Sequence, residues 1–174
     1  MLDVRPTALA GVLEIRPRVI ADDRGFFSEV WSEAAFAAAG IGLNFVQDNH
    51  SLSRDAGVLR GLHFQAPPCA QDKLVRVSRG AVFDVAVDIR PSSLTYRQWV
   101  GVTLTAAEWN QLLIPKGFAH GFLALEPDSE VLYKVSAPYS REHDRAIRFD
   151  DPAIGIAWPI DRAAVILSDR DRAA

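Results

Sequence analysis

Residues 73–88 read KLVRVSRGAVFDVAVD and contain two segments in which side chains alternate at period two. The two segments lie on either side of Gly80, and glycine is typical of tight turns. Alternation at period two is the pattern of a β-strand, whose successive side chains point to opposite faces. The stretch therefore predicts two short strands separated by a turn.

The same pattern continues outward along the chain. It recurs over residues 98–103 and 131–135, and the gaps between segments contain turn-forming residues, which are Gly57, Pro67, Pro68, Gly80, Pro91, Pro115 and Gly117. Many short strands separated by tight turns predict an antiparallel sandwich or small barrel. The chain has no series of βα units, which argues against a doubly wound nucleotide-binding fold.

One short helix is predicted near the N-terminus. Ser32 is suited to an N-cap, residues 33–39 are rich in helix formers, and Gly40 stands where a C-terminal cap is expected. The fold class is therefore all-β with one or a few short helices.

Length and composition predict one globular domain over residues 1–174. Apolar residues make up 49% of the chain, enough for a sizeable core, and the net charge of −3 favours neither a nucleic acid polymer nor an anionic membrane as partner. No stretch approaches the roughly 20 apolar residues of a membrane helix, and residues 1–11 lack the apolar run of a signal peptide. The single cysteine, Cys69, excludes an intrachain disulfide. We therefore expect a cytoplasmic protein.

Five polar residues in apolar, strand-like surroundings are the candidates for chemistry: His63, Lys73, Asp84, His120 and Tyr133. Inward side chains of a small barrel converge on one cavity, and buried polar groups are costly unless they are paired or used. No Gly-rich phosphate loop is present, so a bound nucleotide would have to be held by side chains.

The chemistry that suits this set is proton transfer at a carbon next to a ketone. Imidazole, with an ordinary pKa of about 6.5, is a suitable base, and a carboxylate partner would select its tautomer. Lysine would stabilise the enolate oxygen, and tyrosine could deliver a proton from the opposite face. Inversion at carbon needs both a base and an acid, on opposite faces.

Arg60 and His63 are three residues apart, so a regular strand would place them on opposite faces. A bulge at Gly61 would turn both inward, and otherwise one of them faces a neighbouring chain. The sequence leaves both arrangements open.

Other kinds of site have weaker signals in the sequence. A metal barrel often uses two histidines one residue apart, but Phe64 and Gln65 follow His63; convergence of His50, His63 and His120 is the remaining metal alternative. Ser51, Ser53 and Ser168 lie outside any Gly-x-Ser-x-Gly elbow, and Cys69 is expected in a loop.

Seven blocks together resemble the dTDP-4-dehydrorhamnose 3,5-epimerases. They are RGFFSE (24–29), QDNHS (47–51), VLRGLHFQ (58–65), KLVRV (73–77), FDVAVD (83–88), IPKGFAHGF (114–122) and DDP (150–152). The similarity runs from about residue 10 to about residue 171, in order and with near-family spacing.

This resemblance implies a cupin-type β-jelly roll whose core spans about residues 44–140, with N-terminal strands and a C-terminal segment packed on it. It implies a homodimer without metal or cofactor, acting on a dTDP-4-keto-6-deoxyhexose. The reaction implied is inversion of C3 and C5 of dTDP-4-dehydro-6-deoxy-D-glucose to give dTDP-4-dehydro-L-rhamnose. The alternatives are an epimerase acting at one carbon of a related sugar, a metal-dependent cupin, and a non-catalytic sugar-binding jelly roll.

By position, the resemblance makes His63 the base, Tyr133 the acid, Asp171 the partner of His63, and Lys73 the cation near the sugar ketone. The substrate-binding positions that it implies are Arg24, Phe26, Glu29, Gln47, Asn49, Arg60, His120, Tyr139, Asp144 and Arg170, some of them reaching across from the second subunit. Tyr139 matches the aromatic that stacks on thymine. The chain departs from the family pattern at Arg170, where lysine is usual, and at Asp144, where glutamate is common.

Overall fold

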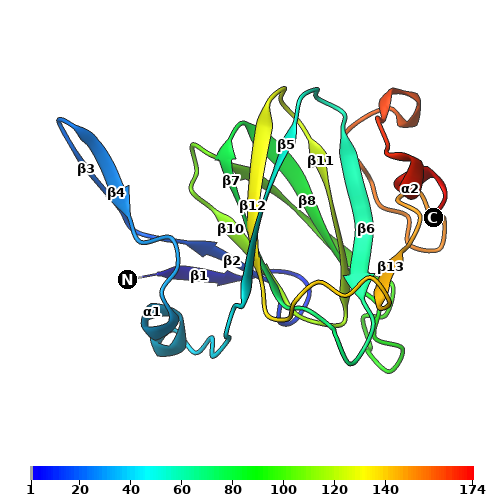
Figure 1. Cartoon of the computed structure of the whole chain (residues 1–174), viewed down its shortest axis with the longest axis horizontal. Coiled ribbons are helices and arrows are strands. Elements are labelled where there is room, and N and C mark those ends of the chain that lie inside the picture. The colour runs from blue at the N-terminus through cyan, green and yellow to red at the C-terminus, as the bar shows by residue number, and fades with distance from the viewer. Residues whose placement is uncertain (1) are drawn as a thin grey trace.

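The computed structural model describes residues 2–174, which form two antiparallel sheets, one separate hairpin and short helices (Figure 1). The strands are β1 (Asp3–Pro6), β2 (Leu13–Arg16), β3 (Val19–Asp22), β4 (Gly25–Ser28), β5 (Gln47–Ser53), β6 (Leu59–Gln65), β7 (Lys73–Arg79), β8 (Ala81–Asp88), β9 (Trp99–Thr105), β10 (Gln111–Ile114), β11 (Phe118–Ala124), β12 (Ser129–Val135) and β13 (Asp144–Ala146). The helices are α1 (Glu33–Ala38), a 3-10 turn at Arg162–Ala164 and α2 (Asp169–Arg172). The all-β class with short helices is confirmed.

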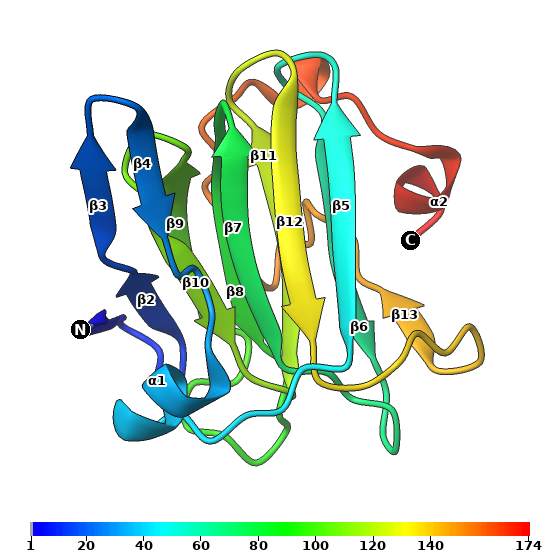
Figure 2. The ribbon, with the colours of Figure 1, turned by 60° about the vertical axis from the view of Figure 1, so that its left-hand side comes forward.

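The two sheets face each other as in a jelly roll. The six-stranded sheet has the order β1-β2-β10-β7-β12-β5, and the five-stranded sheet has the order β13-β6-β11-β8-β9. The turn at Gly80 carries the chain from β7 in the first sheet to β8 in the second, so these successive strands lie in different layers (Figure 2).

Apolar side chains from both sheets meet between the layers. Val75, Val77 and Val131 of the first sheet share a buried cluster with Val82 and Ala86 of the second. Because side chains alternate along each strand, Lys73 and Tyr133 also point to the inside of the barrel.

Strand β8 is buried on both faces because both of its faces are covered. Val85 and Val87 pack outward against Ile154 and Trp158 of the C-terminal segment. The inner face of β8 includes Asp84, which is fully buried. The more apolar face of the strand therefore lies away from the barrel interior.

Helix α1 covers the outside of the six-stranded sheet and begins and ends with the predicted caps. The Ser32 hydroxyl accepts the backbone N–H of Ala35, and Gly40 has a φ of 82°. The N–H of Ile41 reaches the carbonyl of Phe36, which gives the Schellman arrangement. Phe36 and Ile41 then share a buried cluster with the sheet, so the caps also direct the packing.

Strands β3 and β4 pair only with each other and project from the rest of the molecule (Figure 1). The hairpin exposes large apolar residues: Phe26 is 64% exposed to solvent and Phe27 is 69% exposed. Such a patch is typical of an interaction surface. Within residues 2–174 the structure has no helix long and apolar enough to span a membrane.

Candidate active site

A cavity of about 390 Å³ opens between the two sheets. Its walls come from β5, β6, β7, β11, β12, the loop before β13 and the start of α2. The lining residues are Gln47, Asn49, Ser51, Arg60, His63, Phe64, Gln65, Gln71, Lys73, His120, Phe122, Tyr133, Val135, Tyr139, Asp144, Ser168, Arg170 and Asp171. Of the residues predicted to form the site or to carry its chemistry, only Arg24, Phe26, Glu29 and the fully buried Asp84 do not line this cavity.

A β-bulge in β6 turns both Arg60 and His63 toward this cavity. His63 pairs with His120 and Arg60 pairs with Phe122, so two residues of β6 stand opposite the single Gly121 of β11. Gly61 has a φ of 130°, and a Cβ built there would lie 2.5 Å from the Gly121 Cα. Of the two arrangements that the sequence left open, the bulge is the one formed, and it needs glycine at position 61.

His63 is held by a buried carboxylate from the far end of the chain. Its Nε2–H donates to Oδ1 of Asp171 at 2.6 Å, across 108 residues of sequence. Burial works to raise the pKa of Asp171, but hydrogen bonds from His63 and Ser168 lower the pKa below its usual range. An ionised Asp171 keeps the proton of His63 on Nε2, which leaves Nδ1 as the lone-pair nitrogen.

A second histidine–carboxylate pair lies at the cavity wall, where His120 lines the cavity and Asp84 is fully buried. His120 Nε2 lies 3.0 Å from Oδ2 of Asp84, and both side chains are buried. Burial lowers the pKa of His120, which keeps this imidazole neutral. His120 is therefore suited to a polar contact rather than to carrying charge.

Lys73 is the cation of the cavity floor. Its Nζ donates to the backbone carbonyl of His63 at 3.4 Å, and the side chain is buried. Burial lowers the pKa of Lys73 to about 8, while the carboxylates of Asp84 and Asp144 act in the opposite direction. Lys73 can thus be a proton-bearing cation at neutral pH, aimed into a site with little water to screen it.

Tyr133 enters the cavity from the opposite sheet. It lies on β12 of the six-stranded sheet, whereas His63 lies on β6 of the five-stranded sheet. Burial raises the pKa of Tyr133, so its phenol keeps its proton at neutral pH. A proton donor and a proton acceptor therefore stand on opposing walls.

The rim is polar and tied together by hydrogen bonds. Gln47 donates to Asn49 and accepts the backbone N–H of Tyr139. The guanidinium of Arg170 lies 2.7 Å from the carboxylate of Asp144, which also accepts the hydroxyl of Tyr139. The two departures from the family pattern thus contact each other, the longer Arg170 reaching the shorter Asp144.

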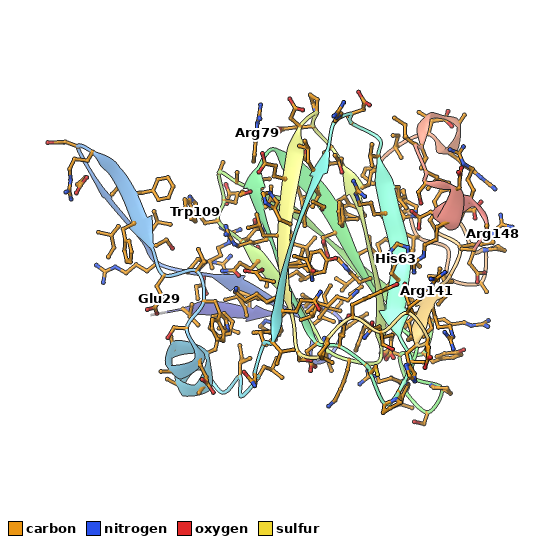
Figure 3. The ribbon with its side chains drawn as sticks, in the orientation of Figure 1. Glu29, His63, Arg79, Trp109, Arg141 and Arg148 are labelled. Carbon is orange, nitrogen blue, oxygen red and sulfur yellow. The ribbon has the colours of Figure 1, made fainter. Side chains whose placement is uncertain are left out.

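Arg24, Phe26 and Glu29 lie outside this cavity. Arg24 is at the turn of the projecting hairpin, with a side chain that is 90% exposed and paired with Asp22. Phe26 packs edge-on against Trp109 with ring centroids 4.5 Å apart. In Figure 3 Glu29 lies at the base of the hairpin, on the side of the molecule away from His63.

Gln65 and Ser168 are among the lining residues that were not given a role from the sequence. Gln65 accepts the backbone N–H of Ser140 and donates to the carbonyls of Cys69 and Pro138, so it holds the loop that carries Tyr139. Ser168 donates to Asp171 and accepts its backbone N–H. The S-x-x-D spacing of Ser168 and Asp171 is a capping pattern that could have indicated this contact.

The three-histidine metal alternative is wrong in geometry. His50 points to the outside of β5 and pairs with Glu130, whereas His63 and His120 face the cavity. Among residues 2–174 no three His, Cys, Asp or Glu side chains are grouped so that they could hold a metal ion.

Comparisons with known proteins identify the family of this chain. The family model described as dTDP-4-dehydrorhamnose 3,5-epimerase matches residues 6–174. The chain is 52% identical over 164 residues to the dTDP-4-dehydrorhamnose 3,5-epimerase of Sinorhizobium fredii, covering 94% of this chain and 84% of the relative.

Solved structures of similar proteins have the same fold. The dTDP-4-dehydrorhamnose 3,5-epimerase of Bacillus anthracis, with TDP and pyrophosphate bound, superimposes with a TM-score of 0.95 at 45% identity, covering 99% of this chain and 97% of that one. The dTDP-6-deoxy-D-glucose-3,5-epimerase of Legionella pneumophila, in complex with dTDP-4-keto-L-rhamnose, gives a TM-score of 0.95 at 43% identity, covering 100% and 92%. A family match along nearly the whole length, together with the two antiparallel sheets around this cavity, shows that the chain belongs to the dTDP-4-dehydrorhamnose 3,5-epimerase family.

Proposed function

We propose that this protein inverts C3 and C5 of dTDP-4-dehydro-6-deoxy-D-glucose, giving dTDP-4-dehydro-L-rhamnose. The observation that carries the proposal is the placement of His63 and Tyr133 on opposing sheets around one cavity. Inversion requires a proton to leave one face of a carbon and another to arrive on the opposite face. A sugar ring bound between the two sheets would present one face to each residue.

The proposed reaction uses groups of the chain alone. Nδ1 of His63 takes a proton from the carbon next to the C4 ketone, and the electron pair moves onto the ketone oxygen. The ammonium of Lys73 stabilises the resulting enolate. Tyr133 then gives its proton to the other face of the carbon, and both residues exchange protons with water before the second carbon reacts.

The nucleotide is proposed to lie at the rim. A shallow hollow shares Tyr139, Asp144 and Arg170 with the cavity and adds Arg141 and Arg145, so arginines gather where a diphosphate would lie. Arginine binds phosphate with two parallel hydrogen bonds. Tyr139 is 57% exposed, so its ring can stack on a base.

We also propose a homodimer in which the hairpin of one subunit completes the site of the other. The exposed Phe26 and Phe27 supply apolar surface for such contact, and Arg24 and Glu29 lie outside the cavity of their own subunit.

The proposed unit is one epimerase domain over residues 1–174, because β1 and β2 join the six-stranded sheet and the C-terminal segment supplies Asp171. The single cysteine fits the reducing cytoplasm in which we place it.

Proton NMR in deuterated water tests the proposal directly. Incubation of dTDP-4-dehydro-6-deoxy-D-glucose with the protein should place deuterium at both C3 and C5 and yield the L-rhamno product. Deuterium at one carbon only would assign a single-carbon epimerase, and exchange at neither carbon would refute the function. The same assay after treatment with a chelator should give an unchanged rate, as expected for a reaction without a metal.

A further inference from the structure

The hydroxyl of Ser168 makes two hydrogen bonds, and both go to one residue. The oxygen accepts the backbone N–H of Asp171 at 3.2 Å, and the hydroxyl donates to Oδ2 of the same residue at 2.7 Å. The first contact caps the N-terminus of α2, and the second holds a carboxylate. Serine, threonine, aspartate and asparagine can all cap, but an ionised aspartate cannot donate.

The carboxylate that Ser168 holds is the one that holds His63. Oδ1 of Asp171 accepts from His63 and Oδ2 accepts from Ser168, and the side chain of Asp171 is 4% exposed. With Ser168 replaced by an apolar residue, Oδ2 would be buried without that donor, and the carboxylate would be held less firmly, by His63 and the backbone N–H of Gly61. The ring of His63 would then lose its fixed orientation.

Helix α2 depends on this contact as well. It has only four residues, and a helix of that length is not stable by itself in water. Ser168 therefore links the start of the helix to the direction of the Asp171 side chain. Ser168 also lines the cavity, but its only donor proton is already given to Asp171.

We propose that Ser168 is a positioning residue of the reaction, which acts by orienting Asp171 and through it the imidazole of His63. This inference rests on the proposed function. It assigns Ser168 no contact with a reacting atom and no role as a nucleophile.

Three substitutions separate donation from capping. Ser168→Ala removes both contacts, Ser168→Asp keeps the cap without a donor, and Ser168→Thr keeps both. We expect kcat to fall on the order of tenfold to a hundredfold in the alanine and aspartate variants, as when outer hydrogen-bond partners of a functional group are lost. Ser168→Thr should stay near the wild type.

The pH profile provides a second readout. The hydrogen bond from Ser168 lowers the pKa of Asp171, so its loss should make the carboxylate easier to protonate. The acid limb of kcat/KM should therefore move to higher pH in Ser168→Ala, and a change that only loosened a helix cap would leave the limb in place.

Ser32→Ala is the matched control, because Ser32 caps α1 through the backbone N–H of Ala35 and has no carboxylate behind it. It should lower the melting temperature without changing the pH profile. Wild-type kcat in Ser168→Ala, or in Ser168→Asp, would overturn the proposal.

A spectroscopic readout keeps the proposal independent of activity. The Nε2–H proton of His63 should give a far-downfield proton resonance in the wild type and in Ser168→Thr, and the resonance should shift or broaden in the other two variants. An unchanged resonance in Ser168→Ala would refute the positioning role even if the protein had no epimerase activity. If the wild type shows no deuterium exchange in the substrate while the His63 resonance still changes in the Ser168 variants, the proposed function would be refuted but the positioning role of Ser168 would not.

Discussion

At the scale of single residues, the site is set apart by charge placed inside the barrel. Lys73, Asp84, His120 and Asp171 are all buried, and burial of a polar or charged group is costly unless a partner compensates for it. The two histidine–carboxylate pairs supply such partners, whereas Lys73 is left with a carbonyl and a pKa lowered to about 8. A buried ammonium with few partners interacts strongly with negative charge that develops next to it.

Substitution of Tyr133 should separate proton removal from inversion. Tyr133→Phe keeps the ring, which packs against the buried cluster that contains Val131, but removes the proton donor. His63 could still take a proton and return it to the same face. We therefore expect deuterium exchange with little or no inversion, measured by NMR of recovered substrate.

His63→Ala is the comparison for that variant, because loss of the base should abolish exchange at C3 and C5. Near-normal inversion at both carbons by Tyr133→Phe would make Tyr133 a packing residue, and the acid would then be another group or a water molecule.

The lowered pKa of Lys73 predicts that activity falls at alkaline pH. Lys73 is charged below its pKa of about 8 and neutral above it. If the ammonium stabilises the enolate, kcat/KM should fall as the pH rises through about 8. A substrate diphosphate raises the pKa of a nearby ammonium, so the limb in kcat should lie at higher pH than the limb in kcat/KM. Lys73→Gln should remove the limb together with most of the activity, and a limb of unchanged position in that variant would exclude Lys73 as its source.

At the scale of elements, the bulge in β6 decides which side chains reach the cavity. A regular strand places residues three apart on opposite faces, and the extra residue at Gly61 brings Arg60 and His63 to the same face.

The C-terminal segment contributes to the site in a different way. It covers the outer face of β8 and then supplies Asp171 to the inside.

A side chain at position 61 should damage both stability and the site. Gly61→Ala would hold a non-glycine residue at positive φ, at about 1–2 kcal/mol, and would force its Cβ against Gly121 at a further cost of about 1–3 kcal/mol. Relief of this overlap would move the bulge, and the folded protein should lose activity beyond the loss of stability. Denaturant titration and kcat on the folded fraction measure the two effects.

Gly42→Ala is the matched control, since a Cβ there meets no atom within 4 Å. It should leave both quantities close to those of the wild type. Full activity in Gly61→Ala would show that the bulge does not position Arg60 and His63.

At the scale of the whole molecule, the hairpin β3–β4 is the part that its own chain leaves exposed. It projects beyond the two sheets and carries the predicted residues that do not reach the cavity (Figures 1 and 3). Light scattering should give about twice the chain mass of 19.1 kDa, as for a symmetric dimer. Phe27→Ser should weaken that assembly, whereas Leu94→Ser, on a fully exposed loop residue, should leave it intact.

A mixing experiment tests whether the hairpin acts across the dimer. In a heterodimer of Arg24→Ala and His63→Ala subunits, one site would have both native residues if Arg24 comes from the partner. Random exchange should then restore about a quarter of the wild-type activity, because half of the dimers are mixed and each has one intact site. No recovery after verified subunit exchange would mean that Arg24 serves the site of its own subunit.

Much of the fold could be predicted because its signals are local. Alternation at period two indicated strands where β7, β8, β9 and β12 form, and Ser32 and Gly40 marked the ends of α1. Each signal depends on a few neighbouring residues and on the geometry of one element. The seven blocks that resemble the family also lie in the sequence itself, so family membership could be expected before the structure was known.

Other features depended on contacts between distant segments. The alternation in β8 distinguished two faces but not the inner one, because the C-terminal segment buries the outer face equally well. The bulge that turns Arg60 and His63 together exists only where Gly121 of another strand lets the backbone approach. The His63–Asp171 contact spans 108 residues, and Ser168 joins it from the N-cap of α2. The sequence determined which elements form, through local periodicity and capping, and the tertiary structure decided which side chains face the cavity, because that depends on what covers each face.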